Sequence, residues 1–412
     1  MHHKQFCHLA VHTSFSFLAA LALMLAIALP AQGPPQGGGP KATIQWFVEG
    51  EPVMKITEEM FDESGELVVT FESNRPLQNV FAWLTPSLAD FVEVAPAEFA
   101  MVERNTPVEI ALTLLAEPES GFGGTIHIKQ NVPGAPGEGA AQGNPAMQGE
   151  MMRSRRTFGR PLPISFQLPG EPEEVEAEAT AVVNAADFRA GGVAPGEVIS
   201  VFGKGLGPAA LETLKLDSRG RVSNMLGDTQ ILFDGLPAPI FHARSDQMSA
   251  VVPFGVEGQG EVVMIVTRKG TVSLPVVLPV VSAAPAIFSL DATGGGQGAI
   301  LNSDFSVNGP SNRASKRSFV SLFGTGAGSM DRPTTDGELV GDELPRVNKP
   351  VSVKIGGVET TMLYAGGAPG LAHGVIQVNV MLDDRVPSGA AVPVTLSVGN
   401  ASSNASVTIA IE

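Results

Sequence analysis

The sequence predicts an all-β fold, and three observations lead to this class. First, the chain of 412 residues contains 47 glycines and 32 prolines, spread as turn residues between short β-branched and apolar runs. Second, many of these runs alternate apolar and polar residues with the period of a strand. Third, the C-terminal half repeats itself over a long segment, which indicates two copies of one β-domain.

The internal repeat is clearest in residues 198–207, VISVFGKGLG, and residues 319–328, FVSLFGTGAG. The glycines that end each run allow the positive φ of a tight turn or bulge. A repeat of this length predicts two complete β-sandwiches, over 181–285 and 286–412. Further pairs follow in the same order: FDG at 233–235 with IGG at 355–357, FHA at 241–243 with LYA at 363–365, and Gln247 with Gln377.

Residues 42–168 predict a first β-sandwich of the immunoglobulin-like type. Trp83 alternates with Phe81 in NVFAWLT, which predicts that its ring packs in the core. The environment of Trp46 stays open, and a surface position would make it a platform for sugar binding. The predicted fold is therefore three Ig-like β-sandwich domains in series, the last two an internal repeat. In the first domain we expect strands at 43–48, 66–73, 79–85, 91–96, 109–116, 125–129 and 163–168.

The first 31 residues have the features of a secretory signal peptide. The apolar run 15–29 is short for a membrane span, and small residues suited to cleavage follow it. An uncleaved N-terminal anchor is the alternative. After a flexible spacer, 32–41, we expect no transmembrane segment, and hence a secreted, periplasmic or cell-surface protein. Because Cys7 is the only cysteine, the mature domains depend on their cores rather than on disulfides.

Two segments differ in composition from the predicted domains. Residues 131–160 are rich in Gly, Pro, Ala and Met, which predicts a disordered excursion between two strands of the first domain. Residues 169–180 contain EPEEVEAEA, which predicts an acidic linker to the second domain. Pro275 and Pro279 interrupt the last run of the second domain, so we expect that strand at a sheet edge.

The C-terminal repeat resembles a known family. The motifs VVNAADFRAGGVAPGEVISVFGKGLGP at 182–208 and SAAPAIFSLDATGGGQGAILNSDFSVNGPSN at 282–312 carry much of the resemblance. They are similar to the uncharacterised Solibacter-type C-terminal domain family of secreted bacterial proteins. The resemblance covers about 180–412 and implies two IPT/TIG-like Ig folds but no activity. Where the family has a valine–asparagine pair, the second domain has Met248 and Ser249, whereas the third keeps the pair as Val378 and Asn379.

The overall charge restricts the partners that the protein can bind. The chain has 42 acidic and 26 basic residues, a net charge of −16. An acidic surface repels nucleic acid and anionic lipid, so we expect neither as a partner. The expected partner is an extracellular or envelope protein or a polysaccharide.

Few residues of the sequence suit catalysis. His127, His242 and His373 fall one in each predicted domain, and no pair of them has metal-ligand spacing. The mature chain has neither a GxSxG motif nor a cysteine nucleophile. The glycine-rich segment 324–328, GTGAG, lacks the lysine of a phosphate-binding loop and is expected to be a turn.

Candidate binding residues come from the repeat and from one acidic loop. Gln247, Gln377 and Asn379 stand beside alternating apolar residues, where a glutamine either binds a ligand or satisfies a loop backbone. Together with Trp46 they are the predicted ligand-binding set. The loop MDRPTTDGELVGDE could supply oxygen ligands to calcium, although an acidic solvated loop is the alternative. The predicted calcium ligands are Asp331, Asp336, Glu338 and Asp342.

These observations favour a function without catalysis. We expect a secreted, non-enzymatic binding or scaffold protein that contacts a protein or the cell envelope through its Ig-like domains. A carbohydrate-binding accessory protein is the alternative, and it depends on an exposed Trp46. A hydrolase that combines His373 with a serine and an aspartate is a remote alternative. Calcium is the one cofactor that the sequence suggests.

Overall fold

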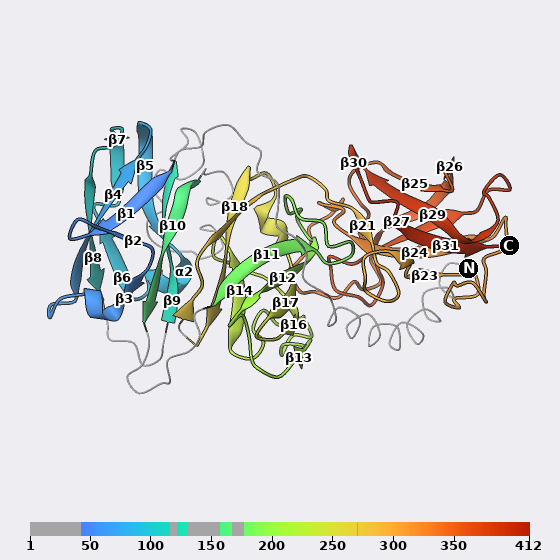
Figure 1. The fold of residues 1–412 in the computed structure, drawn as a ribbon, viewed down its shortest axis with the longest axis horizontal. Helices are drawn as coiled ribbons and strands as arrows, with labels where there is room; N and C mark the ends of the chain where they lie inside the picture. Colours follow the sequence, from blue (N-terminus) through green and yellow to red (C-terminus); the bar gives the residue numbers. More distant parts are fainter. Residues whose placement is uncertain (1–42, 116–121, 131–156, 167–176, 270) are drawn as a thin grey trace.

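The computed structural model describes residues 43–115, 122–130, 157–166, 177–269 and 271–412. This part of the chain is all-β, with six sheets that pair as three β-sandwiches. The sandwiches lie in a row along the long axis of the molecule, in the order of the sequence (Figure 1). The predicted signal peptide, the spacer and most of the predicted excursion and acidic linker lie outside the described residues.

The first sandwich contains two sheets of five strands each. Its elements are β1 (Ile44–Val48), β2 (Glu51–Val53), β3 (Ile56–Thr57), the 3-10 turn η1 (Glu58–Met60), β4 (Glu66–Ser73), β5 (Leu77–Leu84), the short helix α2 (Pro86–Ala89), β6 (Val92–Ala95), β7 (Glu98–Val102), β8 (Val108–Leu114), β9 (Phe122–Gln130) and β10 (Thr157–Phe166). One sheet has the strand order β2-β1-β4-β8-β6, and the other has the order β3-β10-β9-β5-β7. Neighbouring strands are antiparallel, except that β3 and β10 are parallel.

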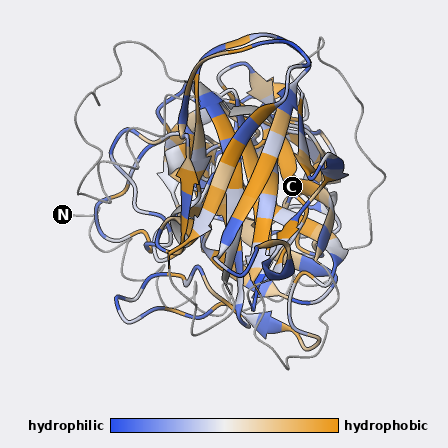
Figure 2. Cartoon of the chain, turned by 90° about the vertical axis from the view of Figure 1, so that its left-hand side faces the viewer, coloured by the Kyte–Doolittle hydropathy of each residue, from blue (hydrophilic) through white to orange (hydrophobic). Residues whose placement is uncertain are grey.

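All seven strands expected in the first domain are present, and the short strands β2, β3 and β7 are additional. Hydrophobic and hydrophilic residues alternate along the strands seen from this end of the molecule (Figure 2). The prediction of an excursion over 131–160 is wrong at its C-terminal end. There β10 begins at Thr157, which pairs with Lys129 of β9, so ladder hydrogen bonds extend further than the composition indicates.

The two tryptophans of the first sandwich lie on opposite kinds of surface, Trp46 in the core and Trp83 on the outer side of its sheet. Trp46 is 4% exposed and packs in the core against Phe71, with 5.5 Å between ring centroids. Trp83 lies half-buried on the outer side of its sheet, because Ala82 and Leu84 take the core positions of β5. The prediction that Trp83 packs in the core is therefore wrong. Alternation shows that Phe81 and Trp83 share a side, but it does not show which side is the core.

The second sandwich follows the same two-sheet plan. Its elements are β11 (Glu178–Asn184), β12 (Val198–Lys204), β13 (Glu212–Thr213), β14 (Thr229–Phe233), β15 (Leu236–Pro237), β16 (Ile240–Ala243), β17 (Gln247–Val251), the 3-10 turn η2 (Phe254–Val256), β18 (Glu261–Arg268), β19 (Thr271–Val272) and β20 (Val276–Pro279). The strand orders are β11-β12-β17-β16-β13 and β15-β14-β18-β19, with β20 also paired to β18. As predicted from its two prolines, β20 is at a sheet edge, since β18 is its one strand partner among the described residues.

The third sandwich ends the described chain. Its elements are β21 (Ala286–Ile287), β22 (Gly296–Gln297), β23 (Ile300–Leu301), β24 (Phe319–Thr325), β25 (Val351–Ile355), β26 (Val358–Glu359), β27 (Thr361–Gly367), β28 (Ile376–Met381), β29 (Gly389–Val398), β30 (Ala401–Ser402) and β31 (Val407–Ile411). The strand orders are β21-β24-β28-β27, with β23 added on β24, and β22-β31-β29-β25-β26, with β30 added on β29.

The strand orders confirm the internal repeat. The path β11-β12-β17-β16 in the second sandwich corresponds to β21-β24-β28-β27 in the third. The path β15-β14-β18 corresponds in the same way to β26-β25-β29. The registers also agree, because Phe202 pairs with Gln247 and Phe323 pairs with Gln377. The two copies therefore share topology and register as well as sequence.

The first and second sandwiches meet through sheet faces, where β19 packs against β9 and β10. Among the described residues, no helix has the length and apolar character needed to cross a membrane.

Candidate functional site at the junction of the second and third sandwiches

A hydrophobic cluster joins the second sandwich to the third. The two sandwiches have separate cores, and this cluster lies apart from both. The second sandwich contributes Ala185, Ala186, Val198, Val222, Phe241 and Val251, and the third contributes Ala286, Phe288, Ala299, Phe323, Ala368, Leu371, Ala372 and Val375. All of these residues are buried, so the two sandwiches share apolar surface as the layers of one domain do.

The local sequence explains why the second sandwich has this second apolar surface. An exposed sheet face gives a strand that alternates apolar and polar residues, but Val198, Ile199 and Val201 of β12 are all fully buried. Ile199 and Val201 belong to the core of the second sandwich, whereas Val198 belongs to the junction cluster. A strand buried on both faces has a nearly continuous apolar run, and in VISVF the one polar residue, Ser200, is also buried.

Hydrogen bonds between the two sandwiches surround the cluster. Thr325 at the end of β24 accepts a bond from the backbone N–H of Val198 at 2.7 Å and donates to the carbonyl of Gly374 at 2.8 Å. Gly337 accepts from the backbone N–H of Val222 at 2.7 Å. These bonds satisfy backbone groups that the junction removes from water, and they fix the orientation of the two sheets.

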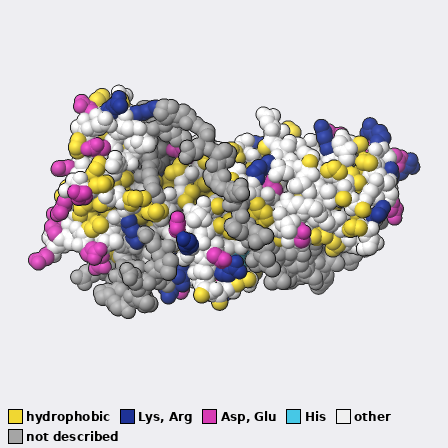
Figure 3. Space-filling model, viewed as in Figure 1, with side chains coloured by type: hydrophobic (Ala, Val, Ile, Leu, Met, Phe, Trp, Pro, Cys, Tyr) yellow, Lys and Arg dark blue, Asp and Glu magenta, His cyan; other side chains and the backbone are white. Residues whose placement is uncertain are grey.

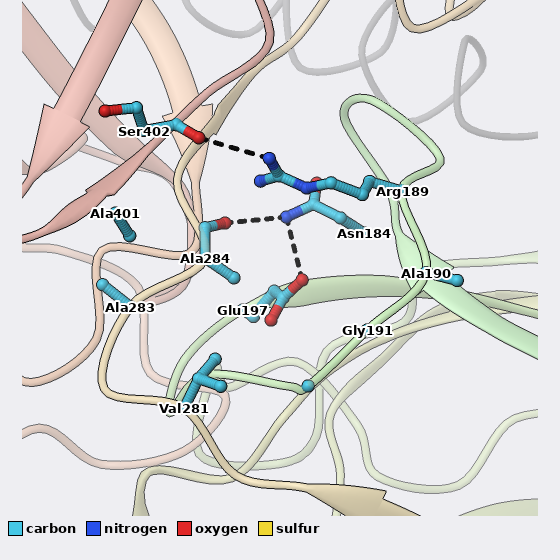
Figure 4. A pocket seen from close by; sticks show the side chains of 11 residues that line it. Asn184, Arg189, Ala190, Gly191, Glu197, Val281, Ala283, Ala284, Ala401 and Ser402 are labelled. Carbon is cyan, nitrogen blue, oxygen red and sulfur yellow. Dashed lines mark hydrogen bonds between the residues drawn. The ribbon is translucent and has the colours of Figure 1, made fainter. Parts of the chain in front are cut away.

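Glu197 is the central polar residue of the junction and is 2% exposed (Figure 4). Its Oε1 accepts a hydrogen bond from Nδ2 of Asn184 at 2.8 Å, and its Oε2 accepts from the backbone N–H of Ala194 at 2.7 Å. Asn184 also donates from Nδ2 to the carbonyl of Ala284 at 2.9 Å, where the chain enters the third sandwich. One amide group thus links the buried acid to the next domain.

Burial raises the pKa of Glu197 to about 8. The hydrogen bonds from Ala194 and Asn184 favour the ionised form, but the loss of hydration outweighs them. Burial likewise raises the pKa of the neighbouring Asp187, against the influence of the backbone N–H and guanidinium of Arg189. Burial therefore shifts Glu197 toward its protonated form inside the junction.

A pocket of about 280 Å³ opens beside Glu197, between the two sandwiches. Arg189 spans it, with Nη1 donating to the carbonyl of Ser402 at 3.2 Å and Nη2 donating to the carbonyl of Pro285 at 3.3 Å. Nδ2 of Asn404 donates back to Asp187 at 3.3 Å. The polar groups of this pocket hydrogen-bond across the junction, so the arrangement couples the two domains and leaves room for small polar molecules.

The predicted ligand-binding residues do not come together in one place. Trp46 lies in the core of the first sandwich and presents no ring face to a sugar. Gln247 is 2% exposed on β17. Gln377 is half-buried on β28, and its Nε2 donates to Oδ1 of Asn379 at 2.9 Å. The two glutamines occupy equivalent places in two different sandwiches.

The predicted calcium loop instead connects the third sandwich to the second. Asp336 accepts a hydrogen bond from the backbone N–H of Phe254 in the second sandwich at 2.9 Å. Asp331 accepts from the backbone N–H of Arg346, while Asp342 is exposed and the carbonyl of Glu338 accepts from the N–H of His373. No three acidic, histidine or cysteine side chains in the described part of the chain form a metal-binding group. The carboxylates of Asp331 and Asp336 thus bond backbone N–H groups in two separate places, and the four predicted ligands do not converge on one point.

The three histidines are buried in three separate sandwiches. Nε2 of His127 lies 2.7 Å from the hydroxyl of Thr125, and burial and then Lys129 hold its pKa well below the usual value. Burial lowers the pKa of His242 to about 4 and also lowers that of His373. The ring of His373 lies edge-on to Phe254, with centroids 6.4 Å apart.

Sequence reasoning missed Asn184 and Glu197. The sequence does contain a signal for Glu197, which is an isolated charged residue directly before the apolar run VISVF. A charged residue at this position either marks the start of the strand at the surface or is buried with it. The third sandwich has a serine, Ser318, at the equivalent position before FVSLF. The prediction of a turn over 324–328 is wrong at its start, because β24 continues to Thr325. Gly326 follows the strand with φ +76°, and a Cβ there would lie 1.9 Å from the carbonyl oxygen of Ala284.

No protein-family model and no curated protein matches the chain. Remote similarity exists to solved structures. SGBP-B of the Bacteroides ovatus mixed-linkage glucan utilization locus, in complex with a heptasaccharide, is 11% identical with a TM-score of 0.25, over 93% of this chain and 70% of that one. The E. coli chaperone DraB is 11% identical with a TM-score of 0.21, over 58% of this chain and 97% of DraB. The Pseudomonas aeruginosa chaperone CupB2 is 12% identical with a TM-score of 0.20, over 57% of this chain and 100% of CupB2. Similarities of this size carry no argument about ligand or activity.

Proposed function

We propose that this protein is a non-enzymatic binding or scaffold protein of the bacterial cell envelope, exported by its predicted signal peptide. The proposal places it outside the cytoplasm, as a secreted, periplasmic or cell-surface protein. Its partner is an extracellular or envelope protein, and its second and third sandwiches act together as a stiff support for the first.

The observation that carries this proposal is the apolar cluster shared by the second and third sandwiches. Independent binding modules are joined by polar linkers and small interfaces, and they move relative to one another. Here Phe323 and Leu371 of the third sandwich are buried against Val198 and Phe241 of the second. Two sandwiches held in one orientation form a rigid base, which is suited to hold the binding surface of the first sandwich in a fixed position relative to the third.

The resemblance to the Solibacter-type C-terminal domain family agrees with this role. The repeated topology of the second and third sandwiches supports two IPT/TIG-like folds, which the resemblance implies. Family membership stays a prediction, because no family model matches the chain.

The alternative functions lack a supporting residue. A carbohydrate-binding accessory protein depends on a surface Trp46, but this ring is in the core. The outward tryptophan, Trp83, has Nζ of Lys129 at 3.9 Å from its ring centroid, so a sugar would have to compete with that contact. The hydrolase alternative depends on His373, whose ring contacts Phe254 within the junction.

The test is retention of the mature chain, from Gln32 onward, on envelope fractions of its own cell. We expect saturable retention that unlabelled protein competes and that disappears when the fraction is first digested with protease. A panel of insoluble polysaccharides, each with calcium and with EDTA, runs in parallel. Retention on a polysaccharide alone would establish the carbohydrate-binding alternative, and retention on neither material would contradict the proposal.

A further inference from the structure

The outer face of one sheet in the first sandwich has a regular pattern across three strands. Val68 of β4 pairs with Ala111 of β8, and Ala111 pairs with Ala95 of β6, so the three side chains form one apolar row. On one side of this row lies the register row Glu66–Thr113–Glu93, and on the other side Thr70 pairs with Glu109. We call this surface the β4-β8-β6 face.

This face is exposed to solvent. Val68 is 55% exposed, and Ala95, Glu66, Glu93 and Glu109 are exposed as well. An exposed valine at the centre of a strand is unusual, because outward positions of a half-buried sheet are normally polar. The neighbouring strand β1 adds the half-buried Phe47 beside Thr70.

The charge around the apolar row has one sign. No lysine or arginine occupies an outward position on β1, β2, β4, β6 or β8. Glu66, Glu93 and Glu109 form no salt bridge within the described part of the chain. Carboxylates are numerous at this end of the molecule in the space-filling view (Figure 3). The carboxylates therefore give this face a negative potential that no basic residue on these five strands offsets.

The opposite face of the first sandwich is covered by the second sandwich. There β9 and β10 pack against β19 of the second sandwich, and Lys129 lies buried over Trp83. The β4-β8-β6 face is on the other sheet, at the end of the row of sandwiches seen in Figures 1 and 2. This position leaves it accessible while the second and third sandwiches support the first from behind.

We propose that the β4-β8-β6 face binds a cationic segment of a partner protein in which lysine or arginine residues flank a small aliphatic centre. Rows on one face of a sheet are about 7 Å apart along the strands, so carboxylates lie on both sides of the apolar row at a distance that lysine side chains span. Burying the apolar row gives affinity, and the surrounding carboxylates select a basic partner and speed its association. Pairing of two copies of this chain through this same face is excluded, because like charges would then face each other.

This inference rests on the proposed binding function, whose partner it describes more closely. The probe is a synthetic peptide in which paired lysines flank a leucine–alanine–leucine centre, and its affinity for the full mature chain is measured by calorimetry at low salt. The test variant carries Glu66→Gln, Glu93→Gln and Glu109→Gln. The matched control carries Glu58→Gln, Glu98→Gln and Glu103→Gln, which change the net charge equally but lie outside this sheet.

We expect the test variant to weaken peptide binding at least about tenfold, and the control variant to weaken it less than about threefold. Val68→Thr, which keeps the β-branched shape, should weaken binding about three- to tenfold. A peptide with serines in place of the leucines should bind the original protein and Val68→Thr equally. Equal losses in both triple variants, or no effect of Val68→Thr, would overturn the proposal.

The same variants separate this inference from the proposed function. If the test variant is retained on envelope fractions as well as the original protein, the β4-β8-β6 face is not the binding surface while the binding function stands. If the original protein itself is not retained, the proposed function fails independently of the peptide result.

Discussion

Glu197 makes the stability of the junction depend on pH. The folded carboxyl retains its proton up to a pKa of about 8, whereas the ordinary value is 4.5. Unfolding between these values therefore releases a proton, and the free energy of unfolding falls as pH rises through this interval and levels off above it. Each pH unit within the interval is worth at most about 1.4 kcal/mol.

The clearest window for measuring Glu197 is pH 6.5 to 9. Below pH 6.5 the buried His242, with its pKa of about 4, makes the free energy of unfolding rise with pH, opposite to the effect of Glu197. Urea unfolding should show the original protein losing about 1 to 2 kcal/mol from pH 6.5 to 9, and Glu197→Gln losing much less. The exposed Glu257→Gln is the control and should keep the original slope. A slope unchanged in Glu197→Gln would show that another group titrates.

His242 is expected to limit stability in acid. Neither ring nitrogen has a hydrogen-bond partner in the described chain, and the hydroxyls of the adjacent Ser200 and Ser249 also lack one. Unfolded His242 gains a proton below pH 6.5, whereas the folded ring accepts one only near pH 4. The contribution of His242 to the free energy of unfolding is therefore complete above pH 6.5 and is lost as pH falls towards 4.

Replacement of His242 tests this acid limit. His242→Phe should unfold at higher urea concentration than the original protein at pH 5, and the gain should shrink by pH 7.5. His242→Gln, which cannot ionise but is polar, should share the weaker pH dependence without the added apolar gain. If the original protein and His242→Phe respond equally to pH between 5 and 7.5, His242 does not govern the acid limit.

At the scale of elements, the acidic loop after β24 functions as a clamp between domains. Asp336 accepts from the backbone N–H of Phe254 across the junction, whereas Asp342 in the same loop is exposed. Asp336→Ala should lower the free energy of unfolding by about 1 to 2 kcal/mol, because the N–H loses its charged acceptor. Asp342→Ala should change it by less than about 0.5 kcal/mol. Calorimetric scans with calcium and with EDTA should coincide for all three proteins, and a calcium-dependent rise in melting temperature would restore the predicted calcium site.

The strands and the repeat could be predicted from sequence because alternation and turn glycines are local signals. The strand ELVVTFES and the paired motifs at 198–207 and 319–328 are of this kind. The predictions that failed depended on contacts between residues distant in sequence. The second sheet decides whether Trp46 or Trp83 faces the core. The partner of Asp336 is a backbone N–H in the 3-10 turn η2, 82 residues away in the sequence. The side chain of Glu197 was missed because a charge is recognised as buried only when its covering domain is known.

At the scale of the whole molecule, the three sandwiches differ in how they are joined. The first meets the second through sheet faces that include the buried, charged Lys129, whereas the second and third share a continuous apolar cluster. Apolar surface shared between domains couples their unfolding, because separation would expose it to water. The second and third sandwiches are therefore expected to be one cooperative unit that supports a more independent first sandwich.

Phe323 tests this coupling, because it is 7% exposed within the shared cluster. Phe323→Ala should lower the free energy of unfolding of this unit by about 3 kcal/mol. Hydrogen exchange should show the loss at β14 in the second sandwich as well as at β25 in the third. Val69→Ala, in the core of the first sandwich, is the control and should leave both strands protected. Faster exchange of β25 with unchanged β14 would mean that the sandwiches unfold separately, and the stiff support on which the scaffold function depends would then be absent.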